Sequence, residues 1–525
     1  MSHQAARAPD ATALLHKKQS FSYAELQYEI EAVSGGLLGL GVAAGDRIAV
    51  YLPKQPETVF GLFGAAAAGA CFVPVNPLLK PAQVAYILKH CNVRVLITSG
   101  QRLKLLQGVL TECPDLHTLV VTEQAVPELT ASFKAKLITY SVFCKHDRAP
   151  SAHRRIDTDI AAILYTSGST GKPKGVVLSH RNMLAGAHSV ASYLGNTPTD
   201  RVLAVLPLSF DAGLSQLTTI FSVGGSAVLM EYLLPRDVIR AVARYQVTGL
   251  AAVPPLWNQL VGLEWPEEAV ETLRYITNTG GAMPVPTTRA LQKALPNTEI
   301  FLMYGLTEAF RSTYLPPDQV DKHPESIGKA IPNAEILVLN KQGQECAPGE
   351  AGELVHRGAL VAMGYWNDPQ KTAERFKPLP ASMPQLPIPE LAVWSGDEVV
   401  KDEEGWLYFV NRKDEMIKTS GYRVSPTEVE EVAYGAGQVA GAVALGLPHA
   451  TLGQTIALII TQTTDSAEPE DVKEHVLLHL QRELPAFMVP AAIVVRESLP
   501  HNQNGKIDRR ALSEEYHALF HQDSN

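Results

Sequence analysis

Short apolar runs alternate with helical stretches over much of the chain, and this alternation restricts the fold more than any other feature. Helical stretches such as residues 103–110 separate runs that are typical of strands: 47–52, 93–98, 119–121, 202–206, 249–253, 275–278 and 300–303. Strands that alternate with helices form β-α-β units, because neighbouring parallel strands need a crossover connection. The expected fold class is therefore α/β.

The chain is long enough for a large body and a smaller second unit. It has 525 residues, of which 46% are hydrophobic, so apolar material suffices for more than one core. We expect mixed, mostly parallel sheets with helices over residues 1–411. A small α+β domain follows over residues 412–525, with strands at 440–447, 455–461 and 491–495 and a helix at 471–483. Five prolines at 378–389 indicate an extended loop inside the large body.

Charge and apolar patterning restrict the partners. Lys and Arg number 45 against 54 Asp and Glu, so the net charge of −9 favours small molecules over nucleic acid or an anionic membrane. The most apolar stretch, residues 59–73, is shorter than the ~18 residues of a membrane span and is interpreted as a buried helix. Five scattered cysteines without a CxxC pair and a start without a secretory pattern favour the cytoplasm.

A segment rich in glycine, hydroxyl and lysine side chains follows the apolar run 160–164. Backbone N–H groups, hydroxyls and ammonium groups in such a loop can surround a polyphosphate. Pro173 follows Lys172, so the segment is not a Walker P-loop, which requires Ser or Thr there. The candidate phosphate-binding residues are Thr166, Ser167, Gly168, Ser169, Thr170, Gly171 and Lys174.

Further motifs in a fixed order make the chain similar to the adenylate-forming superfamily of acyl-CoA synthetases, nonribosomal adenylation domains and luciferases. They are YGLTE at 304–308, WSGD at 394–397, RKDEMIKTSGYRV at 412–424 and NGK at 504–506. The segments 50–54 and 72–81 also resemble a bacterial subgroup of acyl-CoA ligases associated with exosortase loci. The resemblance implies an adenylation core over 1–411 and a mobile lid domain over 412–525.

The resemblance also implies a role for each matched residue. Lys506 lies between the carboxylate and the α-phosphate, Thr307 contacts the α-phosphate, and Glu308 binds Mg²⁺. Asp397 and Arg412 bind the ribose, while Tyr304, Gly305, Gly281 and Ala282 line the nucleotide site. Asp414 is the hinge, and the face with Lys418 and Gly421 serves thiol transfer. Gly280 and Phe210 belong to the acyl pocket.

Asp211 is the departure that bears on the substrate. Many acyl-CoA ligases have Phe-His where this chain has Phe210-Asp211, and Phe-Asp resembles the amino-acid-activating domains. A buried carboxylate needs a partner, which is either a substrate ammonium or a lysine or arginine of the protein. Asp211 is alternatively an N-cap of the helix that begins near Ala212, or binds a substrate hydroxyl.

These observations predict an ATP-dependent enzyme that converts a carboxylic acid into an acyl-AMP and then transfers the acyl group to a thiol. The expected cofactors are ATP, Mg²⁺ and CoA, with the phosphopantetheine of a separate acyl carrier protein as the alternative acceptor. The alternative substrate is an amino acid. A third hypothesis is a luciferase-like oxygenase that uses the same adenylate, and it predicts that the reaction consumes oxygen. A non-catalytic nucleotide-binding relative is disfavoured because Glu308, Asp397, Arg412 and Lys506 are all present.

Overall fold

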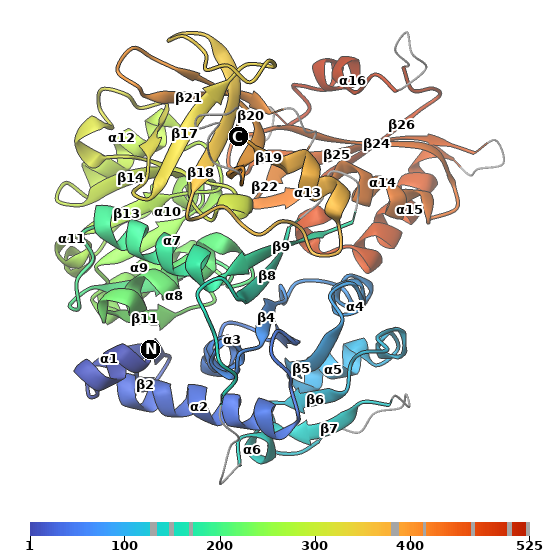
Figure 1. Cartoon of the computed structure of the whole chain (residues 1–525). Coiled ribbons are helices and arrows are strands. Elements are labelled where there is room, and N and C mark those ends of the chain that lie inside the picture. The colour runs from blue at the N-terminus through green and yellow to red at the C-terminus, as the bar shows by residue number, and fades with distance from the viewer. Residues whose placement is uncertain are drawn as a thin grey trace.

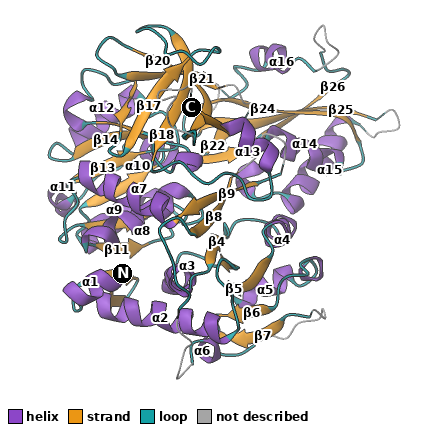
Figure 2. Ribbon diagram, in the orientation of Figure 1, coloured by secondary structure: helices purple, strands orange, loops and turns teal. Residues whose placement is uncertain are grey.

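The computed structural model describes residues 1–126, 134–145, 152–166, 172–379, 388–412, 416–463, 468–500 and 507–520. Two large sheets and one small sheet, with helices packed against them, make up these residues (Figure 1, Figure 2). The predicted α/β fold class is confirmed.

The first sheet has seven strands in the order β7-β6-β5-β3-β4-β8-β9. All neighbours are parallel except the last pair, β8 and β9, which are antiparallel and flank the expected phosphate loop. The strands are β3 (Arg47–Tyr51), β4 (Cys71–Pro74), β5 (Val93–Thr98), β6 (Thr118–Val121), β7 (Lys136–Thr139), β8 (Ile160–Thr166) and β9 (Lys174–Ser179).

The second sheet has 14 strands and changes character along its width. One half is mainly parallel: β1 (Thr12–His16), β11 (Ser226–Leu229), β10 (Arg201–Ala204), β12 (Gly249–Ala252), β13 (Tyr275–Asn278) and β14 (Glu299–Tyr304), with β2 (Gln19–Ser22) antiparallel at its edge. The other half is antiparallel: β15 (Thr313–Leu315), β16 (Ser326–Ala330), β21 (Leu407–Arg412), β20 (Leu391–Lys401), β18 (Ala351–Gly358), β17 (Ala334–Leu339) and β19 (Phe376–Pro378).

Helices pack against both sheets. They are α1 (Ser2–Arg7), α2 (Tyr23–Gly39), α3 (Pro56–Ala68), α4 (Pro81–His90), α5 (Gly100–Leu106), α6 (Tyr140–Phe143), α7 (His180–Tyr193), α8 (Asp211–Val223), α9 (Pro235–Tyr245), α10 (Pro254–Leu260), α11 (Glu267–Thr272), α12 (Val285–Ala294) and α13 (Pro369–Arg375). Short 3₁₀ turns are η1 (Leu110–Glu112), η2 (Thr307–Ala309) and η3 (Pro317–Gln319).

The small C-terminal sheet has five strands with its own buried apolar cluster. Its elements are β22 (Ile417–Thr419), β23 (Tyr422–Val424), α14 (Pro426–Tyr434), β24 (Val439–His449), β25 (Gly453–Gln462), α15 (Pro469–Glu483), η4 (Ala486–Met488), β26 (Ala492–Arg496) and α16 (Arg509–Glu515). Figure 1 shows this unit beside α4 of the large body. Gln83 on α4 donates to Glu428 at 2.7 Å, and Lys80 Nζ donates to the carbonyl of Gln481 at 3.2 Å.

The prediction of one helix over residues 59–73 is wrong in its last part. The helix α3 ends at Ala68, where Gly69 adopts φ +87° and closes the helix in the left-handed conformation that glycine favours. Cys71–Pro74 is instead the buried strand β4. Apolar composition alone could not separate the two, because a buried strand and a buried helix are equally apolar.

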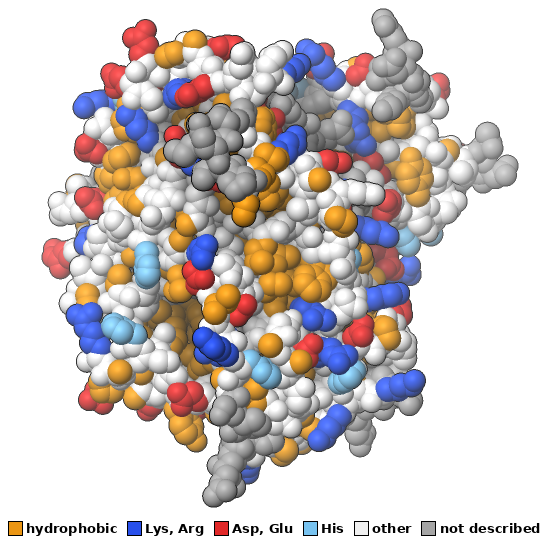
Figure 3. Space-filling view, viewed as in Figure 1, with side chains coloured by type: hydrophobic (Ala, Val, Ile, Leu, Met, Phe, Trp, Pro, Cys, Tyr) orange, Lys and Arg blue, Asp and Glu red, His pale blue; other side chains and the backbone are white. Residues whose placement is uncertain are grey.

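Three other features bear on the sequence predictions. All five cysteines are free thiols. No helix within the described ranges combines the length and the apolar character that crossing a membrane requires. Figure 3 shows basic and acidic side chains interspersed over the visible face.

Candidate active site

A cavity of about 1150 Å³ lies between the two large sheets and the small C-terminal unit. Many of the residues that the sequence singles out line it, although they come from segments up to 255 residues apart. These are Thr166, Phe210, Asp211, Gly280, Gly281, Tyr304, Gly305, Thr307, Lys418 and Gly421. Folding therefore brings the expected acyl-pocket, nucleotide and thiol-transfer residues to one space.

A hairpin of the small unit closes one side of this cavity. Its turn consists of Ser420 (φ +51°) and Gly421 (φ +81°), the two left-handed residues that a tight hairpin turn needs. A Cβ on Gly421 would lie 2.9 Å from the side chain of Val253, so only glycine fits this close approach. The ring of Tyr422 meets that of Phe210 edge-to-face at 5.5 Å, which fixes the hairpin over the acyl side.

The nucleotide side of the cavity is formed at the carboxyl ends of β13 and β14. Asn278 donates from Nδ2 to the carbonyl of Gly281 at 2.8 Å and shapes the turn through Gly280. The phenol of Tyr304 donates to Asp397, which is buried, and the backbone N–H of Asp397 donates to Ser395. Asp397 is paired in register with Arg412 on the neighbouring strand β21.

Glu308 lies behind Thr307, on the 3₁₀ turn η2, and is only 6% exposed. Its Oε1 accepts a hydrogen bond from the phenol of Tyr365 at 2.6 Å. Burial alone would raise the pKa of Glu308, but Arg375 and Arg423 and the Tyr365 hydrogen bond together hold that pKa below its usual value. The carboxylate is therefore kept ionised, as a metal ligand must be.

The carboxylate of Asp211 is paired with an arginine of the protein, Arg311. The helix α8 begins at Asp211 with Phe210 as its N-cap, so the interpretation of Asp211 as the N-cap is wrong. Arg311 Nη1 lies 3.9 Å from Asp211 Oδ2, and both side chains are largely buried. Thr307 donates weakly to Oδ1 at 3.5 Å. Burial raises the pKa of Asp211, and the Arg311 guanidinium counteracts part of that rise.

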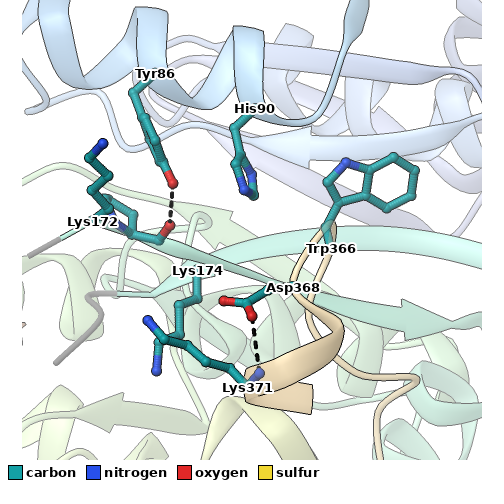
Figure 4. A pocket seen from close by; sticks show the side chains of 8 residues that line it. Tyr86, His90, Lys172, Lys174, Trp366, Asp368 and Lys371 are labelled. Carbon is teal, nitrogen blue, oxygen red and sulfur yellow. Dashed lines mark hydrogen bonds between the residues drawn. The ribbon is translucent and has the colours of Figure 1, made fainter. Parts of the chain in front are cut away.

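A smaller cavity of about 190 Å³ adjoins the start of β9 (Figure 4). Lys172, Lys174 and Lys371 line it, together with His90 and Tyr86 on α4. Burial lowers the pKa of the Lys174 ammonium, and the nearby Lys371 lowers that pKa further. Such a group of like charges favours an anionic ligand.

Several predicted residues do not line either cavity. Ala282 is exposed next to Gly281. Glu308 and Asp397 lie behind the cavity wall. Asp397 contacts Tyr304, and Glu308 lies near Arg423; Tyr304 and Arg423 line the larger cavity. Ser167, Gly168, Ser169, Thr170, Gly171, Asp414 and Lys506 lie outside the described residues, as does most of the proline-rich segment.

Sequence reasoning missed four charged groups and one phenol around the site. Arg311, Tyr365, Arg375 and Arg423 surround Asp211 and Glu308. Lys54 donates from Nζ to the carbonyls of Ala204 and Met230 at 2.8 and 3.0 Å, and burial lowers its pKa to about 7. Signals existed for Arg311, a lone charge among the uncharged residues 309–317 that follow Glu308, and for Arg423, which lies inside the motif at 412–424. The others depend on contacts that only the fold creates.

Comparison with known proteins finds similar sequences over nearly the whole chain. Residues 1–366 match the family described as AMP-binding enzyme, and residues 428–506 match the AMP-binding enzyme C-terminal domain. The chain is 28% identical over 546 residues to the long-chain-fatty-acid–CoA ligase of Salmonella typhimurium, covering 98% of this chain and 93% of the relative. It is also 29% identical over 513 residues to tyrocidine synthase 3 of Brevibacillus parabrevis, covering 97% of this chain and 7% of that protein.

A solved structure shares the fold over the whole length. The o-succinylbenzoate CoA synthetase of Bacillus subtilis, bound with its product analogue, has 24% sequence identity and a TM-score of 0.83. The superposition covers 98% of both chains.

Proposed function

Because the chain belongs to the family of AMP-binding enzymes, we propose that it activates a carboxylic acid with ATP and transfers the acyl group to the thiol of CoA. A carboxylate oxygen of the acid attacks the α-phosphorus, the bond from that phosphorus to the bridging oxygen breaks, and pyrophosphate leaves. The thiolate sulfur then attacks the acyl carbon. The carbon–oxygen bond to AMP breaks, and the thiol proton passes to solvent.

One observation carries this proposal. A single cavity is lined by residues of the nucleotide motifs, by the acyl-side residue Phe210 and by the hairpin of the small unit. An acid, a nucleotide and a thiol arm need such a common space, because each half-reaction joins two of them at one carbon or phosphorus.

The first half-reaction brings two anions together, so catalysis must come from positive groups and hydrogen-bond donors. We assign Lys506 to the charge that develops between carboxylate and α-phosphate, and Thr307 to a hydrogen bond there. Asp397 accepts from the ribose hydroxyls beside Arg412. The segment from Thr166 to Lys174 receives the departing pyrophosphate, and the lysines of the smaller cavity support that assignment.

Glu308 fits a magnesium site that the nucleotide completes. In the described part of the chain no cluster of three or more metal-ligating acidic, His or Cys side chains occurs. Mg²⁺ commonly takes one or two carboxylates together with phosphate oxygens and water. One buried, ionised carboxylate oriented by Tyr365 suits that pattern. Bound Mg²⁺ would neutralise charge on the phosphates.

We further propose two domains, 1–411 and 412–525, that reorient about Asp414. The hairpin with Lys418 and Gly421 serves thiol transfer, and its contact with the cavity supports that role. Lys506 serves the adenylation step in the other orientation. The proposed location is the cytoplasm.

The test is ATP–pyrophosphate exchange over fatty, aryl and amino acids of matched size, with acyl-CoA formation followed by mass spectrometry. Exchange that depends on one acid class, followed by acyl-CoA and AMP in equal amounts, is expected. Exchange without CoA use, but with loading of a carrier protein, selects the alternative acceptor. The similarity to tyrocidine synthase 3 is the reason for testing this alternative acceptor. Absence of exchange with every acid contradicts the proposal.

A further inference from the structure

Arg311 reaches the acyl pocket because of a strained residue before it. Phe310 has φ +57° and ψ −44°, the conformation of a γ-turn, in which the N–H of Arg311 donates to the carbonyl of Ala309 at 2.6 Å. A bulky residue rarely adopts this conformation, which destabilises the backbone by about 1–3 kcal/mol. Packing holds it there: Phe310 is fully buried, and a Cβ on Gly186 would lie 2.4 Å from its ring. The strained turn brings the Arg311 side chain to the cavity wall.

The Arg311 guanidinium is held by the wall of the pocket. Its Nη1 donates to Thr279 Oγ1 at 3.1 Å and lies 3.9 Å from Asp211 Oδ2. Side-chain exposure is 6% for Arg311 and 16% for Asp211, so water solvates the pair only weakly. The charges on the two side chains therefore compensate each other before any ligand binds.

This arrangement has a consequence for the substrate. Asp211 also contacts Thr307, beside the proposed reacting carboxylate, so an ammonium bound to Asp211 would sit on a carbon near that carboxylate. An incoming ammonium would have to displace Arg311 or lie beside a buried like charge, and either event is unfavourable. An acid without an amino group meets a pocket that is already neutral.

We propose that Arg311 is a specificity-determining residue that occupies the position of a substrate ammonium and reserves the pocket for acids without an amino group next to the carboxylate. This inference rests on the proposed function and names its substrate class. Selection works by repulsion of the wrong substrate as much as by attraction of the right one.

The experiment uses two non-hydrolysable acyl-adenylate mimics that differ in one group. They are the acyl-sulfamoyl adenosines of 3-phenylpropanoic acid and of phenylalanine, the second of which adds only the amino group. Binding to the full chain is measured by calorimetry, which does not depend on turnover. We expect the wild type to bind the amine-free mimic at least about 10-fold more tightly.

Arg311→Met should shift the preference toward the amine-bearing mimic by about 10- to 100-fold, because Asp211 then lacks its positively charged partner. Arg311→Lys keeps the positive charge and should keep the wild-type preference. Arg311→Met/Asp211→Asn removes both charges and should discriminate little. The double variant also serves where the single variant folds poorly, and a merely structural role for Arg311 would leave the ratio of the two affinities unchanged.

The possible failures are distinguishable. If the wild type binds both mimics equally, or prefers the amine, the inference about Arg311 is overturned while the proposed adenylation stands. An unchanged ratio in Arg311→Met overturns it in the same way. If neither mimic binds the wild type, the proposed function and the inference both fail.

Discussion

The two ends of the site treat charge in opposite ways. At the acyl end, Arg311 lies against Asp211, so the protein compensates its own charges. At the phosphate end, the smaller cavity is lined by Lys172, Lys174 and Lys371 against one carboxylate, Asp368, among the described residues.

This difference indicates which charge each ligand must bring. The phosphate end is complementary to a polyanion, because burial and the nearby Lys371 both disfavour the charged form of Lys174 until an anion binds. The acyl end is complementary to an uncharged group. The two substrates of the first half-reaction fit the two cavities together, because ATP brings a polyphosphate and a plain carboxylic acid brings an uncharged acyl chain.

The largest expected effect concerns the proposed catalytic charge of the nucleotide end. Lys506→Ala should lower the rate of acyl-AMP formation by about 10²- to 10³-fold, as removal of one transition-state donor does. Thioester formation from supplied acyl adenylate should be retained, because the other orientation performs it. ATP–pyrophosphate exchange and single-turnover thioester assays measure the two steps. Equal losses in both steps would contradict the two-orientation scheme.

A second prediction tests whether the acyl end is neutral by compensation. Asp211→Ala should destabilise the large body by about 2–3 kcal/mol, since it leaves Arg311 buried without its acidic partner. The value is below that of a close pair because the contact is 3.9 Å. Asp211→Ala/Arg311→Met should be more stable than the sum of the single variants predicts. The first transition in urea measures this, and strict additivity would show that the pair is not coupled.

A third prediction concerns the hydrogen bond from Tyr365 to Glu308. Tyr365→Phe removes the hydrogen bond to Glu308 and should weaken activation by Mg²⁺ by about 10-fold, as loss of an outer-shell partner does. Glu308→Gln should have a stronger defect that also depends on Mg²⁺. The Mg²⁺ dependence of pyrophosphate exchange measures both. Tyr408→Phe, which alters a phenol bonded to His323 elsewhere in the sheet, is the matched control; an equal shift there would remove the special role of Tyr365.

The sequence predicted the fold more completely than the site. Strands 93–98 and 275–278 coincide with β5 and β13, because a short apolar run with β-branched residues has few alternatives. Ten of the site residues that the sequence predicted line one cavity. The partner of Asp211 could not be found that way, because Arg311 reaches it only through the strained turn at Phe310. Arg375 and Arg423 likewise act on Glu308 from positions 67 and 115 residues further along the chain.

The smallest expected effect concerns the docking of the small unit, whose hairpin lines the larger cavity. Burial, partly offset by the hydrogen bond from Gln83, raises the pKa of Glu428 to about 7. The docked state therefore holds a proton that a free carboxyl loses near pH 4.5, so docking should weaken as the pH rises from about 4.5 to 7 and then stay weak. Hydrogen exchange of α4 (Pro81–His90), compared at each pH with Glu428→Gln, measures this while intrinsic exchange rates cancel. We expect protection of α4 to fall in the wild type and to stay constant in the variant. A parallel fall in both would mean that another group controls the docking, and that closure of the larger cavity is not linked to this carboxyl.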